Sequence, residues 1–175
     1  MEHKGIKVSG ISFDSRKIKQ GMLFALNKEN NQYISDALRL GAKAVLCKKR
    51  DINSLNKTVK NILVTNDTRL ATAKIAKEFF PYQPKYISAV TGTNGKTSVV
   101  NFLYEIWKKN DINGASFGTL GIKYKNVYKR TKLTTLDAIN LHRELDNLKN
   151  KKINFLAMEA SSHALEQKRM DKVKV

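Results

Sequence analysis

The stretch VTGTNGKTS, residues 90–98, carries two glycines, a lysine and three threonines, and it begins at the last residue of the strand-like run YISAV. Glycines permit backbone conformations and close approaches that a side chain forbids, so the amides around them can point at an anion. The lysine can reach the β- and γ-phosphates of a nucleotide, and the threonine hydroxyl after it can ligate Mg²⁺. The spacing predicts a phosphate-binding loop. The alternative is a polar surface turn before a helix.

The predicted nucleotide contacts are the loop residues themselves: Gly92, Thr93, Asn94, Gly95, Lys96, Thr97 and Ser98. The common phosphate loop has a glycine five residues before its second glycine, whereas this chain has Val90 there and reads G-x-x-G-K-T. Such a loop does not by itself distinguish a kinase, a GTPase or a ligase, so the rest of the sequence must decide.

The loop needs a strand before it and a helix after it. A strand is expected over residues 86–90 and a helix over residues 97–110. The apolar residues of this helix form one stripe and a second group beside it: Val100, Leu103 and Trp107, then Val99, Phe102 and Ile106. A glycine-broken strand region is expected over residues 115–124.

A second helix is expected over residues 137–149 because its apolar residues recur at spacings of three and four. Thr134, three residues before Asp137, resembles the start of a capping box. His142 is expected in solvent, on the face away from the leucines. Residues 153–158 read like a strand buried on both faces of a parallel sheet. Strands and helices alternate, which indicates an α/β fold.

The first part of the chain shows short mixed elements, with a helix expected over residues 33–40 and another over residues 68–80. Pro81 and Pro84 end the second of these helices and mark the best linker candidate. We therefore expect two domains, residues 1–84 and residues 85–175.

The composition and the net charge limit the classes of function that fit this chain. The chain has 175 residues and a formal charge of +18, from 33 Lys and Arg against 15 Asp and Glu. The basic residues are dispersed, so we favour a lysine-rich surface over a nucleic-acid partner. No run of eighteen apolar residues occurs, so no membrane span is expected. The single cysteine, Cys47, is expected to be a small buried hydrophobic residue, which suits a cytoplasmic protein.

Three further motifs accompany the loop. Asp14-Ser15-Arg16 precedes a Gly-Met-Leu-Phe-Ala run, residues 133–138 read LTTLDA, and residues 158–165 read MEASSHAL with Gln167 and Arg169 beyond. Together with VTGTNGKTS, these motifs resemble those of the Mur ligases of the MurE type, the UDP-N-acetylmuramoyl-tripeptide synthetases. The resemblance covers essentially the whole chain.

The resemblance implies a small N-terminal α/β domain that binds UDP-MurNAc, followed by the first part of a P-loop-type parallel-sheet domain that binds ATP. It implies amide formation in peptidoglycan synthesis. ATP would phosphorylate the D-glutamate carboxylate of UDP-MurNAc-L-Ala-D-Glu, and the amine of a diamino acid, meso-diaminopimelate or L-lysine, would then displace phosphate.

The resemblance also implies roles for particular residues. Lys96 and Glu159 would be catalytic, and Thr97 and Glu159 would hold Mg²⁺. The predicted substrate contacts are Phe13, Ser15, Thr134, Thr135, Ser161, Gln167 and Arg169. Two of them have narrower roles: Ser15 would bind the uridine diphosphate end, and Phe13 would lie near the uracil. The role of His163 is left open.

The sequence departs from the family in three places. The family's glycine-rich stretch before Tyr33 is shortened here to residues 27–31, and Leu136 replaces a proline. The chain stops just past the MEASSHAL motif, whereas family members continue much further. We therefore expect an N-terminal fragment with no ligase activity alone and an unpaired sheet edge. A separate chain that carries the missing C-terminal part is a candidate partner, and the sequence does not show whether such a chain completes the site.

Two other functions compete with this interpretation. A further Mur ligase or a folylpolyglutamate synthetase would share the loop, although the Thr134-Thr135 and Ser161-Ser162-His163 runs argue against it. A non-catalytic nucleotide-binding remnant would keep the loop without the reaction.

Overall fold

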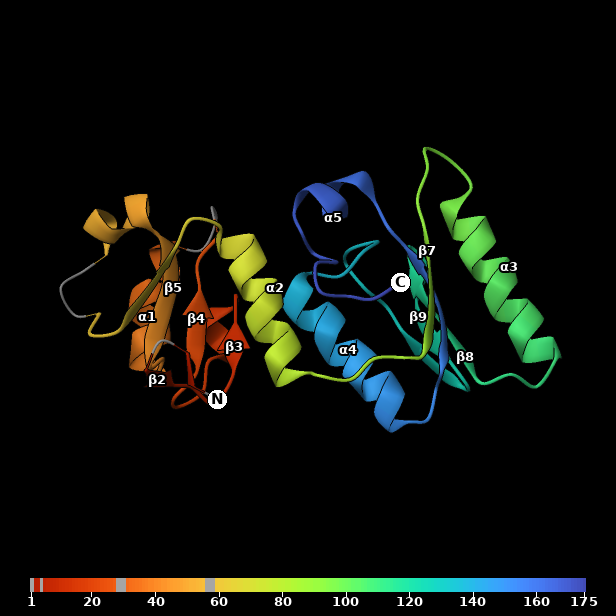
Figure 1. Ribbon diagram of the computed structural model, residues 1–175, viewed down its shortest axis with the longest axis horizontal. Coiled ribbons are helices and arrows are strands. Elements are labelled where there is room, and N and C mark those ends of the chain that lie inside the picture. Colours follow the sequence, from red (N-terminus) through yellow and green to blue (C-terminus); the bar gives the residue numbers. More distant parts are fainter. Residues whose placement is uncertain (1, 4, 28–30, 56–58) are drawn as a thin grey trace. The chain divides into compact units, whose positions relative to one another are not determined.

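The computed structural model describes residues 2–3, 5–27, 31–55 and 59–175 (Figure 1). The chain forms two compact units, Met1–Phe79 and Phe80–Val175. The division lies five residues before the boundary expected from Pro84. Most of the shortened loop at residues 27–31 lies outside the described residues.

The first unit is built on a parallel four-stranded sheet in the order β3-β4-β5-β6. Its elements are β1 (Glu2–His3), β2 (Ile6–Lys7), β3 (Ile11–Ser12), a 3₁₀ turn η1 (Ser15–Lys17), β4 (Leu23–Ala25), η2 (Asn31–Tyr33), α1 (Ile34–Arg39), β5 (Ala44–Lys48), η3 (Lys49–Ser54), β6 (Ile62–Thr65) and α2 (Thr68–Phe79). Strands β1 and β2 form a separate antiparallel pair. Cys47 is fully buried in β5, and this burial raises the pKa of its thiol, as expected for a structural cysteine.

The second unit has a five-stranded sheet in the order β10-β9-β8-β11-β7. Its elements are β7 (Tyr86–Val90), α3 (Lys96–Lys109), β8 (Gly114–Gly118), β9 (Gly121–Tyr124), β10 (Val127–Lys129), α4 (Ala138–Asn150), β11 (Phe155–Glu159) and α5 (Ser162–Glu166). Strands β7, β11 and β8 are parallel, whereas β9 and β10 continue as an antiparallel meander. The expected glycine-broken region is therefore the β8–β9 hairpin.

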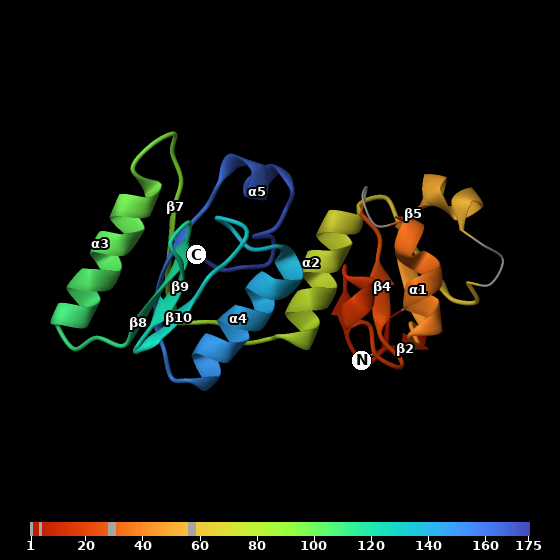
Figure 2. The same cartoon turned by 180° about the vertical axis from the view of Figure 1, so that it is seen from behind.

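Helices α3 and α4 lie on opposite faces of this sheet (Figures 1 and 2). The α4 face holds the core, in which Leu141, Leu145 and Leu148 are fully buried against the strands. On the α3 face, β8 presents only small residues, and the Trp107 ring of α3 lies so close to Gly114 that a Cβ there would clash with it. Helix α3 can approach β8 because that face of the strand lacks large side chains.

Two expectations about α4 are wrong. Its N-cap is Asp137, whose carboxylate accepts from the Asn140 amide at 3.0 Å, so Thr134 does not start the helix. Asp is a strong N-cap by itself and needs no residue three positions earlier. His142 is fully buried, and its Nε2 lies 3.0 Å from the carbonyl oxygen of Asp171. The segment after α5 covers it, which helix periodicity alone does not reveal.

Helix α3 also differs from its expected pattern. Val100 and Tyr104 are buried, whereas Val99, Phe102 and Ile106 are 44%, 63% and 54% exposed. The latter three lie at helical spacing on one flank, which we call the α3 stripe. The opposite flank faces β9, because Asn101 accepts from Lys123 Nζ at 3.1 Å. The α3 stripe is therefore turned away from β9 and from the buried face of the helix.

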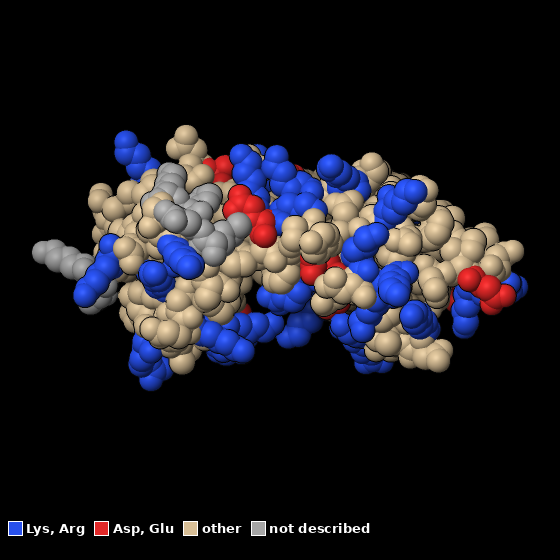
Figure 3. Space-filling model, turned by 60° about the horizontal axis from the view of Figure 1, so that its bottom comes forward, with Lys and Arg blue, Asp and Glu red and all other residues tan. Residues whose placement is uncertain are grey.

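Basic side chains are spread over the face of the molecule shown in Figure 3, interspersed with uncharged residues. Among the described helices, none is both long and apolar enough to cross a membrane.

The α4 core gives a stability prediction for the second unit. We expect Leu145→Ala to lower its free energy of unfolding by about 2–5 kcal/mol, since a fully buried leucine leaves a cavity. Leu133→Ala, at an exposed position, should change it by less than about 0.5 kcal/mol. Denaturant unfolding followed by fluorescence of the single tryptophan, Trp107, measures both. Equal effects would contradict the assignment of the core.

Candidate functional site

The predicted phosphate loop runs from the end of β7 to the start of α3 (Figure 1). Gly92 and Gly95 have φ of +140° and +79°, a region that side chains other than glycine rarely adopt. Gly95 is the N-cap of α3. The first amides of a helix have no intrahelical partner and carry partial positive charge, so this end of α3 can receive an anion. Thr93, Asn94 and Ser98 are exposed.

Lys96 lies over the loop. Its Nζ donates to the carbonyl oxygens of Gly92 at 2.6 Å and Thr93 at 3.3 Å. The ammonium group therefore sits beside the loop amides rather than extending into solvent, in a place from which it can reach a bound phosphate.

Glu159 lies at the same end of the sheet as the loop. It is the last residue of β11 and pairs in register with Val90, the last residue of β7. Its side chain faces α3, and Thr97 Oγ1 donates to its Oε1 at 3.0 Å. Glu159 is only 2% exposed, so hydrogen-bond donors must stabilise the charge of its carboxylate in place of water.

Thr119, in the β8–β9 turn, supplies two of those donors and was missed from the sequence. Its amide donates to Glu159 Oε1 at 2.7 Å, and its hydroxyl lies 3.3 Å from Oε2. Gly118 permits this turn, since an added Cβ would clash with the Glu159 carboxylate. The sequence signal was the Gly-Thr-Leu-Gly run, which can be read as a turn but not as a partner of Glu159.

Several predicted substrate residues form one network beside Glu159. Thr135 Oγ1 donates to the carbonyl oxygen of Glu159 at 2.7 Å, and the Ser161 amide donates to Thr135 Oγ1 at 3.2 Å. The Arg169 guanidinium donates to the Thr135 carbonyl oxygen at 2.9 Å and twice to Gln167 Oε1, at 2.7 and 3.0 Å. These contacts fix the segment after β11 against the segment before α4.

Thr134 joins this network through Thr119, because the two hydroxyl oxygens are 3.1 Å apart. His163 is exposed on α5, outside these contacts. The structure therefore brings together Thr97, Glu159, Thr134 and Thr135 in the second unit, with Thr119 between them.

Phe13 and Ser15 belong to the first unit. Ser15 is buried and begins η1. Asp14 caps this turn by accepting from the Arg16 amide at 3.1 Å. The Arg16 guanidinium donates to both Asp14 carboxylate oxygens, which lowers the pKa of Asp14. The Asp14-Ser15-Arg16 motif is thus a tight, charged turn.

The Thr97 hydroxyl and the Glu159 carboxylate offer oxygen ligands of the kind that hard cations prefer. They border a hollow of about 10 Å³, room for roughly one water molecule, also lined by Ser116 and Gly118. Within the described residues, no three His, Cys, Asp or Glu side chains gather as a metal cluster. One carboxylate beside a phosphate loop suits an ion that takes its other ligands from phosphates and water.

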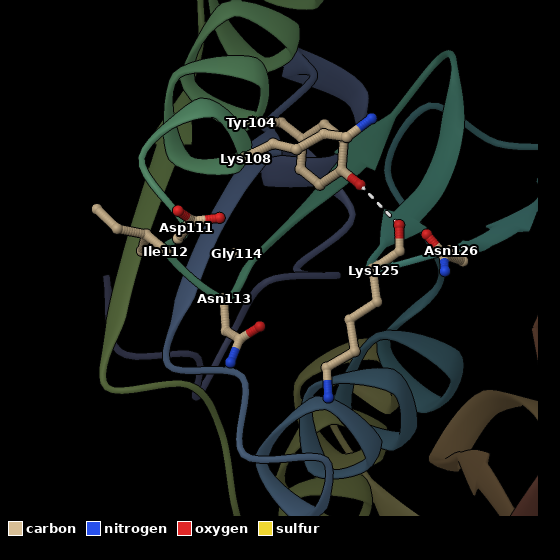
Figure 4. A pocket seen from close by; sticks show the side chains of 8 residues that line it. All are labelled: Tyr104, Lys108, Asp111, Ile112, Asn113, Gly114, Lys125 and Asn126. Carbon is tan, nitrogen blue, oxygen red and sulfur yellow. Dashed lines mark hydrogen bonds between the residues drawn. The ribbon is translucent and has the colours of Figure 1, made fainter.

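A separate hollow of about 200 Å³ lies at the other end of the sheet (Figure 4). It is bounded by the end of α3, the start of β8 and the β9–β10 turn, where Tyr104 donates to the Lys125 carbonyl oxygen at 3.3 Å. Burial raises the pKa of Tyr104. The ammonium groups of Lys108 and Lys125 point to different sides rather than toward one point. The predicted functional residues of the second unit lie at the opposite end of β8.

Known proteins share the sequence and the fold of this chain. Residues 90–175 match the Mur ligase middle domain. The chain is 40% identical over 174 residues to the UDP-N-acetylmuramoyl-L-alanyl-D-glutamate–2,6-diaminopimelate ligase of Mesorhizobium japonicum, covering 97% of this chain and 36% of that protein. It is 36% identical over 180 residues to the ligase of the same name from Rickettsia typhi, covering 98% and 36%.

Two solved ligase structures superimpose on most of this chain. A UDP-N-acetylmuramoyl-L-alanyl-D-glutamate–2,6-diaminopimelate ligase superimposes with a TM-score of 0.76 at 31% identity, over 94% of this chain and 34% of that chain. The MurF ligase from Thermotoga maritima, solved in complex with ADP, superimposes with a TM-score of 0.58 at 19% identity, over 91% and 34%, and shows the shared fold alone.

Residues 90–175 are thus a Mur ligase middle domain, and the α/β architecture expected from the sequence is confirmed. The chain is a homologue of the UDP-N-acetylmuramoyl-L-alanyl-D-glutamate–2,6-diaminopimelate ligases, the MurE type, as its motifs indicated. It spans about a third of the length of the relatives it matches.

The close approach of Gly118 to Glu159 gives a test of this geometry. We expect Gly118→Ala to displace the carboxylate from Thr97 and Thr119 and to destabilise the second unit by about 1–3 kcal/mol. In the Glu159→Ala background the same change should cost much less, because the clashing atoms are gone. Trp107 fluorescence during denaturation measures all four proteins of this cycle. An equal cost in both backgrounds would contradict the contact.

Proposed function

We propose that this chain forms the nucleotide-binding part, and much of the UDP-sugar-peptide-binding part, of an ATP-dependent amide ligase of peptidoglycan synthesis. The observation that carries the proposal is the phosphate loop facing a buried carboxylate, with Thr97 Oγ1 and Glu159 Oε1 3.0 Å apart. The homology to 2,6-diaminopimelate ligases supports UDP-MurNAc-L-Ala-D-Glu as the acceptor and diaminopimelate, rather than lysine, as the incoming amino acid.

The reaction has two balanced steps. A carboxylate oxygen of the D-glutamate attacks the γ-phosphorus of ATP, the bond to the β-γ bridging oxygen breaks, and ADP leaves. The amine of the diamino acid then attacks the acyl carbon, loses a proton and expels phosphate as the amide forms. Both steps need negative charge neutralised around the transferred phosphoryl group.

The loop residues supply that neutralisation in our proposal. The amides at the start of α3 and Lys96 contact the β- and γ-phosphates. Thr97 and Glu159 are the protein ligands of Mg²⁺, which when bound neutralises charge on the phosphates. Lys96 exchanges the Gly92 and Thr93 carbonyl oxygens for phosphate oxygens as the nucleotide enters.

The network beside Glu159 holds the sugar-peptide in this proposal. Thr134 and Ser161 offer hydroxyls to the sugar-peptide, and Thr135, whose own hydroxyl bonds the Glu159 carbonyl oxygen and the Ser161 amide, contacts it from the same network. Arg169, oriented by Gln167, offers a guanidinium suited to a carboxylate or phosphate. In the first unit, Ser15 and Phe13 are proposed to contact the uridine diphosphate end.

We further propose that a polypeptide corresponding to the remaining two-thirds of the relatives completes the site. Strand β7 is the edge of its sheet, and Tyr86 is 49% exposed there. The α3 stripe, on the exposed face of the helix that follows β7, carries no charge. An open strand edge and an exposed apolar stripe on the next helix suit the addition of another strand and its connecting helix.

Nucleotide binding tests the proposed function directly. We expect Lys96→Ala to weaken Mg²⁺·ADP binding by about 10–100-fold, since a charge-assisted contact to phosphate is lost. Lys109→Ala, at the other end of the same helix, serves as the matched control and should leave the affinity within about twofold. Titration calorimetry measures both. A wild-type chain that binds no Mg²⁺·ADP would overturn the proposal.

The completing polypeptide gives a second prediction. The chain alone should form no tripeptide product from ATP, UDP-MurNAc-L-Ala-D-Glu and diaminopimelate. Adding the Mesorhizobium ligase segment beyond the matched third should restore product and protect the β7 amides from hydrogen exchange. Phe102→Asp in the α3 stripe should prevent this, whereas Tyr128→Asp, at a position on β10 that is 57% exposed against 63% for Phe102, should not. Product from the chain alone would contradict the requirement for a partner.

A further inference from the structure

The Thr119 hydroxyl occupies a position between the proposed nucleotide end and the proposed substrate end of the site. It lies 3.3 Å from Glu159 Oε2 and 3.1 Å from Thr134 Oγ1. Its own amide is already committed to Glu159 Oε1 at 2.7 Å, which fixes the residue in place. The hydroxyl oxygen is therefore held in one place, with a possible hydrogen-bond partner on each side.

A hydroxyl has one proton to donate, so only one of these neighbours can receive it. If Thr119 donates to Glu159, the Thr134 hydroxyl must donate to Thr119, and Thr134 then shows only lone pairs to a ligand. If Thr119 donates to Thr134 instead, the proton of Thr134 is free to donate outward. Both arrangements fit the same oxygen positions.

The charge on Glu159 decides between the two arrangements. With no cation, the carboxylate is the stronger acceptor, because hydrogen bonds to an ionised group are about twice as strong as neutral ones. A cation held by Glu159 neutralises that negative charge, so the carboxylate is no longer a stronger acceptor than the Thr134 hydroxyl. The Thr119 proton then turns toward Thr134.

We propose that Thr119 is a positioning residue whose single hydroxyl proton couples Glu159 to Thr134. A cation at Glu159 changes Thr134 from an acceptor into a donor toward the substrate. The inference rests on the proposed function, since it takes Glu159 as a cation ligand and Thr134 as a substrate contact. A donating Thr134 suits the carboxylate and phosphate oxygens of UDP-MurNAc-L-Ala-D-Glu, so the nucleotide with its cation favours binding of that substrate.

Coupled binding is the measurable consequence, and thermodynamic linkage makes it reciprocal. We expect the dissociation constant of UDP-MurNAc-L-Ala-D-Glu, measured by calorimetry on the full chain with ADP present, to fall at least about fivefold when Mg²⁺ replaces EDTA. In Thr119→Val, which keeps the backbone amide but lacks the hydroxyl, the factor should drop to about one. Thr119→Ser should retain the wild-type factor.

Controls separate this role from a general disturbance of the site. Thr119 is exposed in its turn, and Thr119→Ala provides a second hydroxyl-free variant if valine does not fit. Thr131→Val removes a hydroxyl that donates to the Leu133 carbonyl oxygen, not to Glu159, and should keep the coupling. Mg²⁺·ADP affinity in Thr131→Val should remain within about threefold of wild type.

The outcomes distinguish the two proposals. A wild-type chain that binds no Mg²⁺·ADP overturns the ligase function, and this inference with it. A wild-type chain that binds Mg²⁺·ADP but shows no Mg²⁺-dependent substrate affinity overturns the coupling alone. Equal coupling in wild type and in both hydroxyl-free variants overturns the role of Thr119.

Discussion

A buried carboxylate at the end of a parallel strand constrains how the elements of the second unit pack. Glu159 is almost inaccessible to water, and an isolated charge in such a place is strongly unfavourable. It is tolerated because Thr97 and Thr119 donate to it from α3 and the β8–β9 turn. Those donors must therefore stay at hydrogen-bonding distance, which fixes the start of α3 and the β8–β9 turn.

The small residues on the α3 face of β8 follow from the same constraint. Gly118 leaves room for the carboxylate, and Gly114, at the other end of the strand, leaves room for Trp107. With side chains at either position, α3 could not lie close enough for Thr97 to reach Glu159. The glycines of β8 have low β-propensity, but the close packing of α3 on this strand requires them.

Much of this architecture could be predicted from the sequence, because the signals are local. A strand, a glycine loop with Lys and Thr, and an amphipathic helix predict a phosphate loop by spacing alone. Thr119 could not be found that way, since its partner is forty residues away and only strand order brings them together. His142 was placed in solvent because helix periodicity does not show which later segment covers a face. The exposure of Phe102 was not recognised either, because the apolar spacing does not show which face of the helix packs on the sheet.

The Lys96 contacts with the Gly92 and Thr93 carbonyl oxygens have a thermodynamic consequence. These hydrogen bonds already hold the loop in its curved conformation. An entering triphosphate therefore does not have to order a flexible segment. Binding there exchanges one set of acceptors for another and loses little conformational entropy. We therefore expect nucleotide association to be governed by enthalpy and desolvation, with on-rates close to those of rigid pockets.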